Sequence, residues 1–210
     1  FVSRGELFVS DIEGKFIRQI AANPDERIME VLWLADNETV LFSQTVNGWL
    51  NLFTIKVDGK SKEKQLTSDS RNNRSVVLSN DKTKAAYLSG RDELRVMELK
   101  DFSSKTIVKD EFWALNSSDP QFSPDDKFLL YNAMRNFEQD IFVYDFTYDK
   151  SFQITKTGVT ESSPVWSPDG KYIYFQTERL KASYPRGTSN DDIYRIALQV
   201  TDKEFKSDRY

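Results

Sequence analysis

Two residue types are missing from this 210-residue sequence, namely histidine and cysteine. Without histidine, the chain by itself cannot provide Ser-His-Asp or Cys-His catalysis, His-ligated zinc or His-ligated haem. Without cysteine, it has no disulfide bond, no thiolate nucleophile and no Cys-ligated zinc site. The chemistry left to these residues is carboxylate-pair catalysis, a Ser-Lys pair, an oxygen-ligated metal, or no reaction at all.

Long apolar runs are also missing. The longest are short, such as FLLY at 128–131, whereas a membrane-spanning helix needs roughly 18 apolar residues. Basic residues number 29 and acidic residues 33, so the net charge is −4, which disfavours binding to nucleic acid or to anionic membranes. The chain starts inside a strand-like segment, FVSRGELFVS, without an initiator Met. We therefore expect a piece of a longer protein, no membrane insertion and no nucleic-acid partner.

A repeat of about 44 residues runs through the chain. Four segments align: VLWLADNETVLF (31–42), VVLSNDKTKAAY (76–87), PQFSPDDKFLLY (120–131) and PVWSPDGKYIYF (164–175). Three columns share one register: a large apolar residue (Trp33, Leu78, Phe122, Trp166), an aspartate (Asp36, Asp81, Asp125, Asp169) and an aromatic residue (Phe42, Tyr87, Tyr131, Phe175). A period of this length, rich in β-branched and aromatic residues, is typical of β-propeller blades.

The repeat predicts an all-β fold, a β-propeller of four-stranded antiparallel blades. The predicted blades are 1–22 (the tail of a first blade), 28–67, 73–109, 116–155 and 160–210. Each sheet must bury both faces against its neighbours, so the large apolar column is expected to form the core between blades. Four to five blades are near the minimum for a closed ring, which favours an incomplete part of a six- or seven-bladed propeller.

A tight turn connects the first two strands of each unit and is clearest in SPDG at 167–170. Gly170 tolerates a positive φ angle there. Asn37 suits the same position in its unit, whereas Lys82 and Asp126 fit it less easily.

The segments SPDGKYIYF and FSPDDKFLLY resemble the Asp-Gly-turn propeller repeat of TolB and of the tricorn protease. The flanking segments RNFEQDIFVYDF and GVTESSPVWSPDGKYIYFQTERLKASYPRG are similar to the N-terminal propeller of bacterial tricorn-like serine peptidases. In that family, propellers precede a PDZ-like module and a catalytic domain with the nucleophilic Ser and its His. The resemblance implies a non-catalytic domain that guides or gates peptides or unfolded protein segments, with catalysis in a part of the parent outside this sequence.

The same resemblance implies a periplasmic protein, with the cytoplasm as the alternative, and leaves a homo-oligomeric parent open. A TolB-like protein-binding propeller and the propeller of a prolyl-oligopeptidase-type hydrolase are the alternative functions. Calcium loops of the D-x-D-x-D-G type and phosphate loops of the G-x-x-x-x-G-K-[ST] type do not occur, so we expect no cofactor.

Candidate substrate-binding residues fall into three groups. The first is an arginine column four residues past the repeated aromatic: Arg91, Arg135 and Arg179. It either holds peptide carboxylates or, as the more ordinary use of arginine, pairs with nearby acids such as Asp92, Glu93, Glu138 and Asp140. The second group starts the inner strands and comprises Arg74, Asp119 and Glu161; a hydrated tunnel without ligand is the alternative. The third group, Tyr184 and Arg186, lies in the longest loop, 177–191. This loop either docks to a neighbouring domain or partner, or is a tolerated surface insertion. Glu30, Asp119 and Glu161 would be the first suspects for a catalytic carboxylate pair.

Overall fold

The computed structural model describes residues 1–21, 25–113, 119–180 and 192–198. These ranges contain 18 strands and no helix. In chain order the strands are β1 (Val2–Ser3), β2 (Glu6–Ser10), β3 (Ile17–Ala21), β4 (Ile28–Trp33), β5 (Thr39–Val46), β6 (Trp49–Lys56), β7 (Lys64–Gln65), β8 (Asn73–Leu78), β9 (Lys84–Ser89), β10 (Glu93–Glu98), β11 (Ser103–Lys109), β12 (Gln121–Phe122), β13 (Phe128–Arg135), β14 (Glu138–Asp145), β15 (Lys150–Gln153), β16 (Glu161–Trp166), β17 (Tyr172–Thr177) and β18 (Asp192–Ala197).

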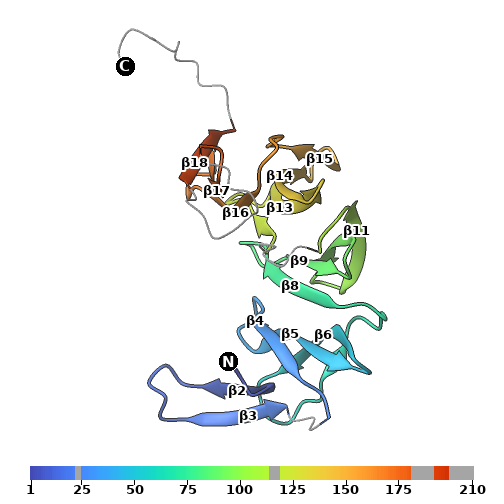
Figure 1. The fold of residues 1–210 in the computed structure, drawn as a ribbon. Coiled ribbons are helices and arrows are strands. Elements are labelled where there is room, and N and C mark those ends of the chain that lie inside the picture. Colours follow the sequence, from blue (N-terminus) through green and yellow to red (C-terminus); the bar gives the residue numbers. More distant parts are fainter. Residues whose placement is uncertain (22–24, 114–118, 181–191, 199–210) are drawn as a thin grey trace.

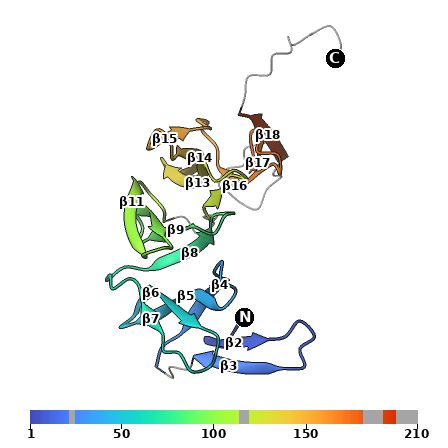
Figure 2. The same cartoon turned by 180° about the vertical axis from the view of Figure 1, so that it is seen from behind.

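Consecutive strands pair antiparallel within five separate sheets. We call these sheets blade 1 (β1–β3), blade 2 (β4–β7), blade 3 (β8–β11), blade 4 (β12–β15) and blade 5 (β16–β18). Figure 1 shows the blades following one another along an open arc, with β8 and β16 toward its inside and β11 and β15 on its outside. The view from behind in Figure 2 shows the same order. The predicted all-β propeller architecture is therefore confirmed.

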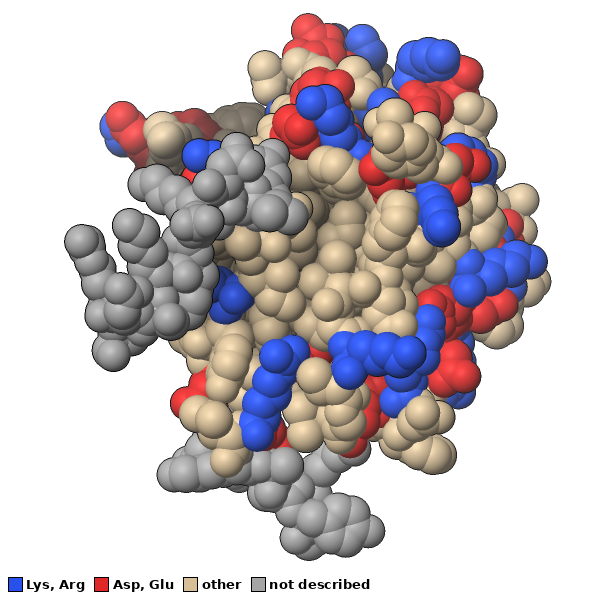
Figure 3. All heavy atoms as spheres, turned by 90° about the horizontal axis from the view of Figure 1, so that it is seen from above, with Lys and Arg blue, Asp and Glu red and all other residues tan. Residues whose placement is uncertain are grey.

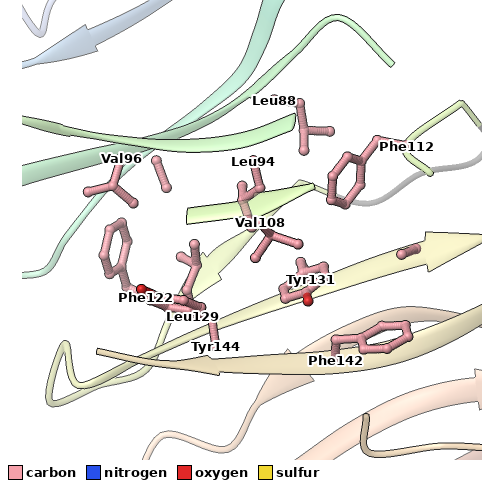
Figure 4. Close-up of a cluster of buried hydrophobic side chains, with 12 residues drawn as sticks. Leu88, Leu94, Val96, Val108, Phe112, Phe122, Leu129, Tyr131, Phe142 and Tyr144 are labelled. Atoms are coloured by element: carbon pink, nitrogen blue, oxygen red, sulfur yellow. The ribbon is translucent and has the colours of Figure 1, made fainter. Parts of the chain in front are cut away.

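Apolar side chains from adjacent blades form the core. Between blades 3 and 4, Leu94 and Val108 lie opposite Leu129 and Tyr131, and Figure 4 shows these side chains pointing toward one another. Similar clusters join the other neighbouring blades. The repeated aromatic column lies inside these clusters, with at most 2% of any side chain exposed: Phe42, Tyr87, Tyr131 and Phe175. Each such burial contributes about 1.5–3 kcal/mol.

The large apolar column ends the first strand of each complete unit and packs on the preceding blade, with one exception. Phe122 is buried, and Trp166 packs against Phe128 of blade 4 with ring centroids 6.3 Å apart. Trp33 instead remains 42% exposed. It lines a cavity of about 210 Å³ against blade 1, in which three strands are described. The expectation that Trp33 belongs to the core between blades is therefore wrong, because its neighbour covers it incompletely.

The turns between the first two strands repeat the same backbone conformation. Asn37, Lys82, Asp126 and Gly170 all have positive φ angles, between 54° and 69°. Asp126 is held there by its own carboxylate, which accepts hydrogen bonds from the backbone nitrogens of Asn80 and Asp81 at 2.8 and 2.9 Å. A link between blades thus offsets the strain of a non-glycine residue in this conformation.

Among the described residues, blade 5 is the last sheet of the arc. One position in the third strand of each blade comes just before the residue that pairs with the repeated aromatic. In blades 2, 3 and 4 this position is held by Leu52, Leu94 and Ile141, each of which is 0% exposed. Ile193 holds that position in blade 5 and is 75% exposed. The outward face of blade 5, which also exposes Gln176 and Arg195, therefore has no covering blade in the described residues. The described part of the chain also holds no helix of the length and apolarity required to span a bilayer.

Candidate functional site

The first strands of the blades line the inside of the arc. β4 lies beside β8, and β8 lies beside β12, so residues that begin these strands come from successive blades to one inner surface. The sequence places polar residues at these strand starts. Asp119 is exposed and Glu30 and Arg74 are partly buried, whereas Glu161 is fully buried and needs polar partners inside the molecule.

Glu30, Arg74 and Asp119 form a cluster of alternating charge on this inner surface. The Glu30 carboxylate accepts hydrogen bonds from the backbone nitrogen of Ser75 at 2.9 Å and of Val76 at 3.5 Å. Burial raises the pKa of Glu30, the two backbone hydrogen bonds lower it, and the negative charge of Asp119 raises it further. The structure thus brings together two predicted site residues, Arg74 and Asp119, with the suspected carboxylate Glu30.

Arg74 belongs to the blade that follows Glu30 and precedes Asp119, and it forms no salt bridge to either acid in the described residues. Its Nη2 donates to the backbone oxygen of Phe112 at 2.8 Å and of Gly90 at 3.4 Å. Burial lowers the pKa of the guanidinium, whereas the charges of Glu30 and Asp119 raise it. The backbone carbonyls of two connections therefore hold this cation in place.

Arg135 and Arg179, from the predicted column, bind carboxylates. Arg135 forms a two-pronged pair with Asp110, at 2.5 Å for Nη1–Oδ1 and 2.7 Å for Nη2–Oδ2. Arg179 donates through Nε at 2.7 Å, and also through Nη2, to Oε1 of Glu161. The paired acids differ from those nearest in sequence because Asp110 follows β11 and Glu161 begins β16. These internal pairs occupy both guanidinium groups.

Arg91, the third member of the column, has a different environment. Its guanidinium lies over the ring of Trp113 at 5.9 Å from the centroid, and it forms no salt bridge among the described residues. The Trp113 ring is in turn 6.4 Å from the ring of Phe137, at an interplanar angle of 78°. We call Arg91, Trp113 and Phe137 the aromatic cluster.

A buried acidic pair connects blades 4 and 5. Asp140 is 3% and Glu161 0% exposed. Burial raises the pKa of Asp140, and the charge of Glu161 raises it further, against a hydrogen bond from Thr155. Thr157 donates to Oε1 of Glu161 at 2.9 Å. Oε2 of Glu161 has no hydrogen-bond partner among the described residues. Arg179 neutralises this pair in part, so the arrangement fits a polar joint between blades.

An apolar groove separates the outer parts of blades 4 and 5. Its volume is about 410 Å³, and its walls include Phe128, Phe152, Trp166 and Leu198. Figure 3, viewed onto the end of the arc where β15 and β18 lie, shows a hollowed area with few charged side chains and Lys, Arg, Asp and Glu around its margin. Tyr184 and Arg186 of the predicted loop lie outside the described residues.

Trp113 and Phe137 were not among the residues singled out from the sequence. A signal was present, because the β5–β6 turn is Asn47-Gly48 and the corresponding β13–β14 turn is Asn136-Phe137. The exchange of glycine for phenylalanine in a turn of this type departs from the local rule. Trp113 carried no comparable signal, since it belongs to a connection outside the aligned segments.

Comparisons with known proteins agree on the fold. No protein-family model matches the sequence. A tricorn-like protease C-terminal subunit from Sulfurisphaera tokodaii is 22% identical over 204 residues, which cover 97% of this chain and 23% of that protein. A crystal structure of the tricorn protease matches with a TM-score of 0.74 and 21% identity, over 94% of this chain and 20% of that one. TolB from Acinetobacter baumannii matches with a TM-score of 0.63 and 18% identity, over 94% and 47%.

The predicted resemblance to a β-propeller domain of tricorn-like peptidases is confirmed by these matches. The chain spans less than a quarter of the length of the tricorn-like relative. Structural likeness at this level of identity establishes the propeller architecture, and function must be argued from the residues themselves.

Proposed function

We propose that this chain is a non-catalytic propeller domain of a tricorn-like serine peptidase, and that it guides or gates peptide substrates on their way to a catalytic domain outside this sequence. The observation that carries the proposal is the inner surface, where Glu30, Arg74 and Asp119 present alternating charge from three successive blades. The similarity to a tricorn-like protease supports the peptidase context.

An extended peptide has polar backbone groups along its whole length. Its backbone amides require hydrogen-bonding partners or water all along a path, and a charged, hydrated strand edge offers both. Blades packed through apolar cores resist widening, so a path between them would admit an unfolded segment and exclude a folded domain. Guidance of this kind requires no nucleophile, in keeping with a sequence that has no histidine or cysteine.

Further blades belong to the same proposal. The exposed face around Ile193 would be covered by the next blade of a six- or seven-bladed ring, with PDZ-like and catalytic domains elsewhere in the parent. By family resemblance we place that parent in the periplasm, with the cytoplasm as the alternative.

A labelling experiment tests the proposal. Because this sequence contains no cysteine, a single introduced cysteine gives one attachment point for a bulky maleimide within the propeller. Met29 on the inner strand β4 is 59% exposed and is the test position, as Met29→Cys. Ser104 on the outer strand β11 is also exposed, and Ser104→Cys is the matched control. The background is the parent peptidase with any other cysteines replaced.

The expected result is a fall of about ten-fold in kcat/KM for an unfolded protein substrate after labelling at position 29, equivalent to about 1.4 kcal/mol in the barrier. Hydrolysis of a short fluorogenic peptide should stay within a factor of two or so of the unlabelled rate, because it needs no guided path. Equal effects of the label at positions 29 and 104 would contradict the proposal.

A further inference from the structure

The aromatic cluster stands at the end of blades 3 and 4 where the connections between blades lie. Its three members come from separate segments: Arg91 from the β9–β10 hairpin, Trp113 from the link between β11 and β12, and Phe137 from the β13–β14 turn. The backbone nitrogen of Phe112 donates to the carbonyl of Arg91 at 2.8 Å, which fixes two of these segments against each other. The cluster is thus a preassembled surface on a rigid scaffold.

Phe137 is costly for the fold. It is 77% exposed, and its φ angle is 69°, a conformation in which a bulky side chain is rare. The preceding Asn136 also has a positive φ angle, 51°, so the turn requires positive φ at both central positions. The same turn in blade 2 uses Asn47 and Gly48, with φ angles of 51° and 82°. Glycine would satisfy the backbone more easily, whereas phenylalanine places an aromatic ring against Trp113 at the surface.

Arg91 adds a charge that is available to a ligand. The acids around it are already engaged: Asp92 by Arg71, Asp110 by Arg135, and Glu111 by the indole nitrogen of Trp113 at 3.1 Å. Arg91 itself is exposed and stacks on Trp113, without a salt bridge in the described ranges. Stacking on a ring leaves the edge of the guanidinium free to bind a carboxylate through two hydrogen bonds.

We propose that the aromatic cluster binds an extended peptide in which an apolar side chain adjoins a carboxylate. The apolar side chain packs against Trp113 and Phe137, and the carboxylate pairs with Arg91. Tryptophan and arginine are the side chains that most often carry binding energy at protein surfaces. This inference rests on the proposed handling of peptides, and it assigns a substrate chemistry and a place of first contact.

Fluorescence anisotropy on the full chain tests the inference. The probe is a fluorescein-labelled Gly/Ser peptide that carries one Asp-Phe pair, compared with the same peptide carrying Lys-Phe or Asp-Gly. We expect Asp-Phe to bind at least about ten-fold more tightly than either. Phe137→Gly should weaken binding of Asp-Phe by a similar factor, and a cooperative thermal transition shows that the variant is still folded.

Two further variants complete the experiment. Arg91→Met should remove the preference for Asp-Phe over Lys-Phe. Trp49→Ala is the matched control, because Trp49 is 42% exposed at the corresponding hairpin of blade 2, and binding should not change. Equal binding of all three peptides, or unchanged binding by Phe137→Gly, would overturn the inference; so would capture of a folded partner with no affinity for peptides.

The test separates the inference from the proposed function. Loss of the peptide site by mutation, with no change in degradation of unfolded protein by the parent, would leave the site valid and count against guidance. The opposite outcome is also informative. If the label at position 29 slows degradation of unfolded protein by the parent, but the aromatic cluster does not bind the Asp-Phe peptide, guidance remains valid and the proposed peptide site is wrong.

Discussion

Arg91, Arg135 and Arg179 occupy one repeated position in three successive blades, and each guanidinium has a different environment. Two of them bind carboxylates inside the molecule, and Arg91 stacks on Trp113 at the surface. The same residue type at the same place in a repeat thus serves stability in two blades and remains available for a ligand in one. The difference arises from the connections between blades, which supply Asp110 and Trp113.

Removal of the Arg179 guanidinium should destabilise the fold. Arg179→Met leaves the Glu161 carboxylate, 0% exposed, without its cation. Loss of one partner of a buried pair typically costs 3–5 kcal/mol; because Arg179 is itself 30% exposed, we expect about 2–3 kcal/mol. Arg91→Met, which breaks no salt bridge in the described residues, should cost less than about 0.5 kcal/mol. Urea unfolding of both variants checks this, and equal losses would contradict the assignment.

The turn aspartates should stabilise the fold above acidic pH. Hydrogen bonds from the Ser79 hydroxyl and the Thr83 backbone lower the pKa of Asp81 below its ordinary 3.8. Its contribution is therefore complete above pH 3.8 and is lost as the pH falls through the lower folded-state pKa. Asp81→Asn should cost about 1 kcal/mol at neutral pH. Unfolding curves of variant and wild type should converge in acid, and a pH-independent difference would refute the account.

The contribution of Glu30 to stability should depend on pH with the opposite sign. Burial raises its pKa above the ordinary 4.5, so its contribution to stability is present below pH 4.5 and is lost as the pH rises through the higher folded-state pKa. The stability difference between Glu30→Gln and wild type should therefore shift in favour of the variant as the pH rises across this interval. Denaturant titrations at a series of pH values measure the shift; a shift toward wild type would be inconsistent with burial as the main cause.

At the scale of elements, β14 and β18 are the same strand of two blades in different surroundings. Ile141 in β14 is 0% exposed, and Ile193 in β18 is 75% exposed. Blade 5 lies on one side of blade 4 and blade 3 on the other, whereas blade 5 has a described neighbour on one side alone. The position of a strand along the arc, and not its own sequence, decides how much of it is buried.

Alanine substitutions at these two positions should separate the two environments. Ile141→Ala creates a cavity in the core between blades and should cost about 2–5 kcal/mol. Ile193→Ala removes a side chain that is already in solvent and should cost less than about 0.5 kcal/mol in this chain. Thermal unfolding gives the comparison. A large loss at position 193 would mean that its face is covered, and that the open end of the arc is wrong.

The strands and turns were predictable because they repeat. The columns ending at Leu78, Phe122 and Trp166 marked first strands, and the turn position at Asn37 and Gly170 required a positive φ angle. Trp33 was mispredicted because its burial depends on a neighbouring sheet and not on its column. The partners Asp110 and Glu161 of the arginines were not predictable either, since loops between blades bring together residues that no local pattern relates.

At the scale of the whole molecule, the blades form an open arc (Figure 1). Apolar side chains fill the space between blades, and Glu30, Arg74 and Asp119 lie at the inner strands. The faces of the sheets thus provide the stability. The inner strands, and the end of blades 3 and 4 where the connections between blades lie, remain for binding. We therefore expect a bound peptide along the inner strands β4, β8 and β16 and at the aromatic cluster, but not along β7, β11 and β15 on the outside.

Photo-crosslinking maps that location directly. A Gly/Ser peptide with one Asp-Phe pair and a benzophenone group is irradiated with the full chain, and the attachment sites are read by mass spectrometry. We expect attachment on β4, β8 and β16 and around Trp113. In the variant Phe137→Gly, the attachment sites around Trp113 should be lost. Attachment concentrated on β7, β11 and β15 would contradict this expectation.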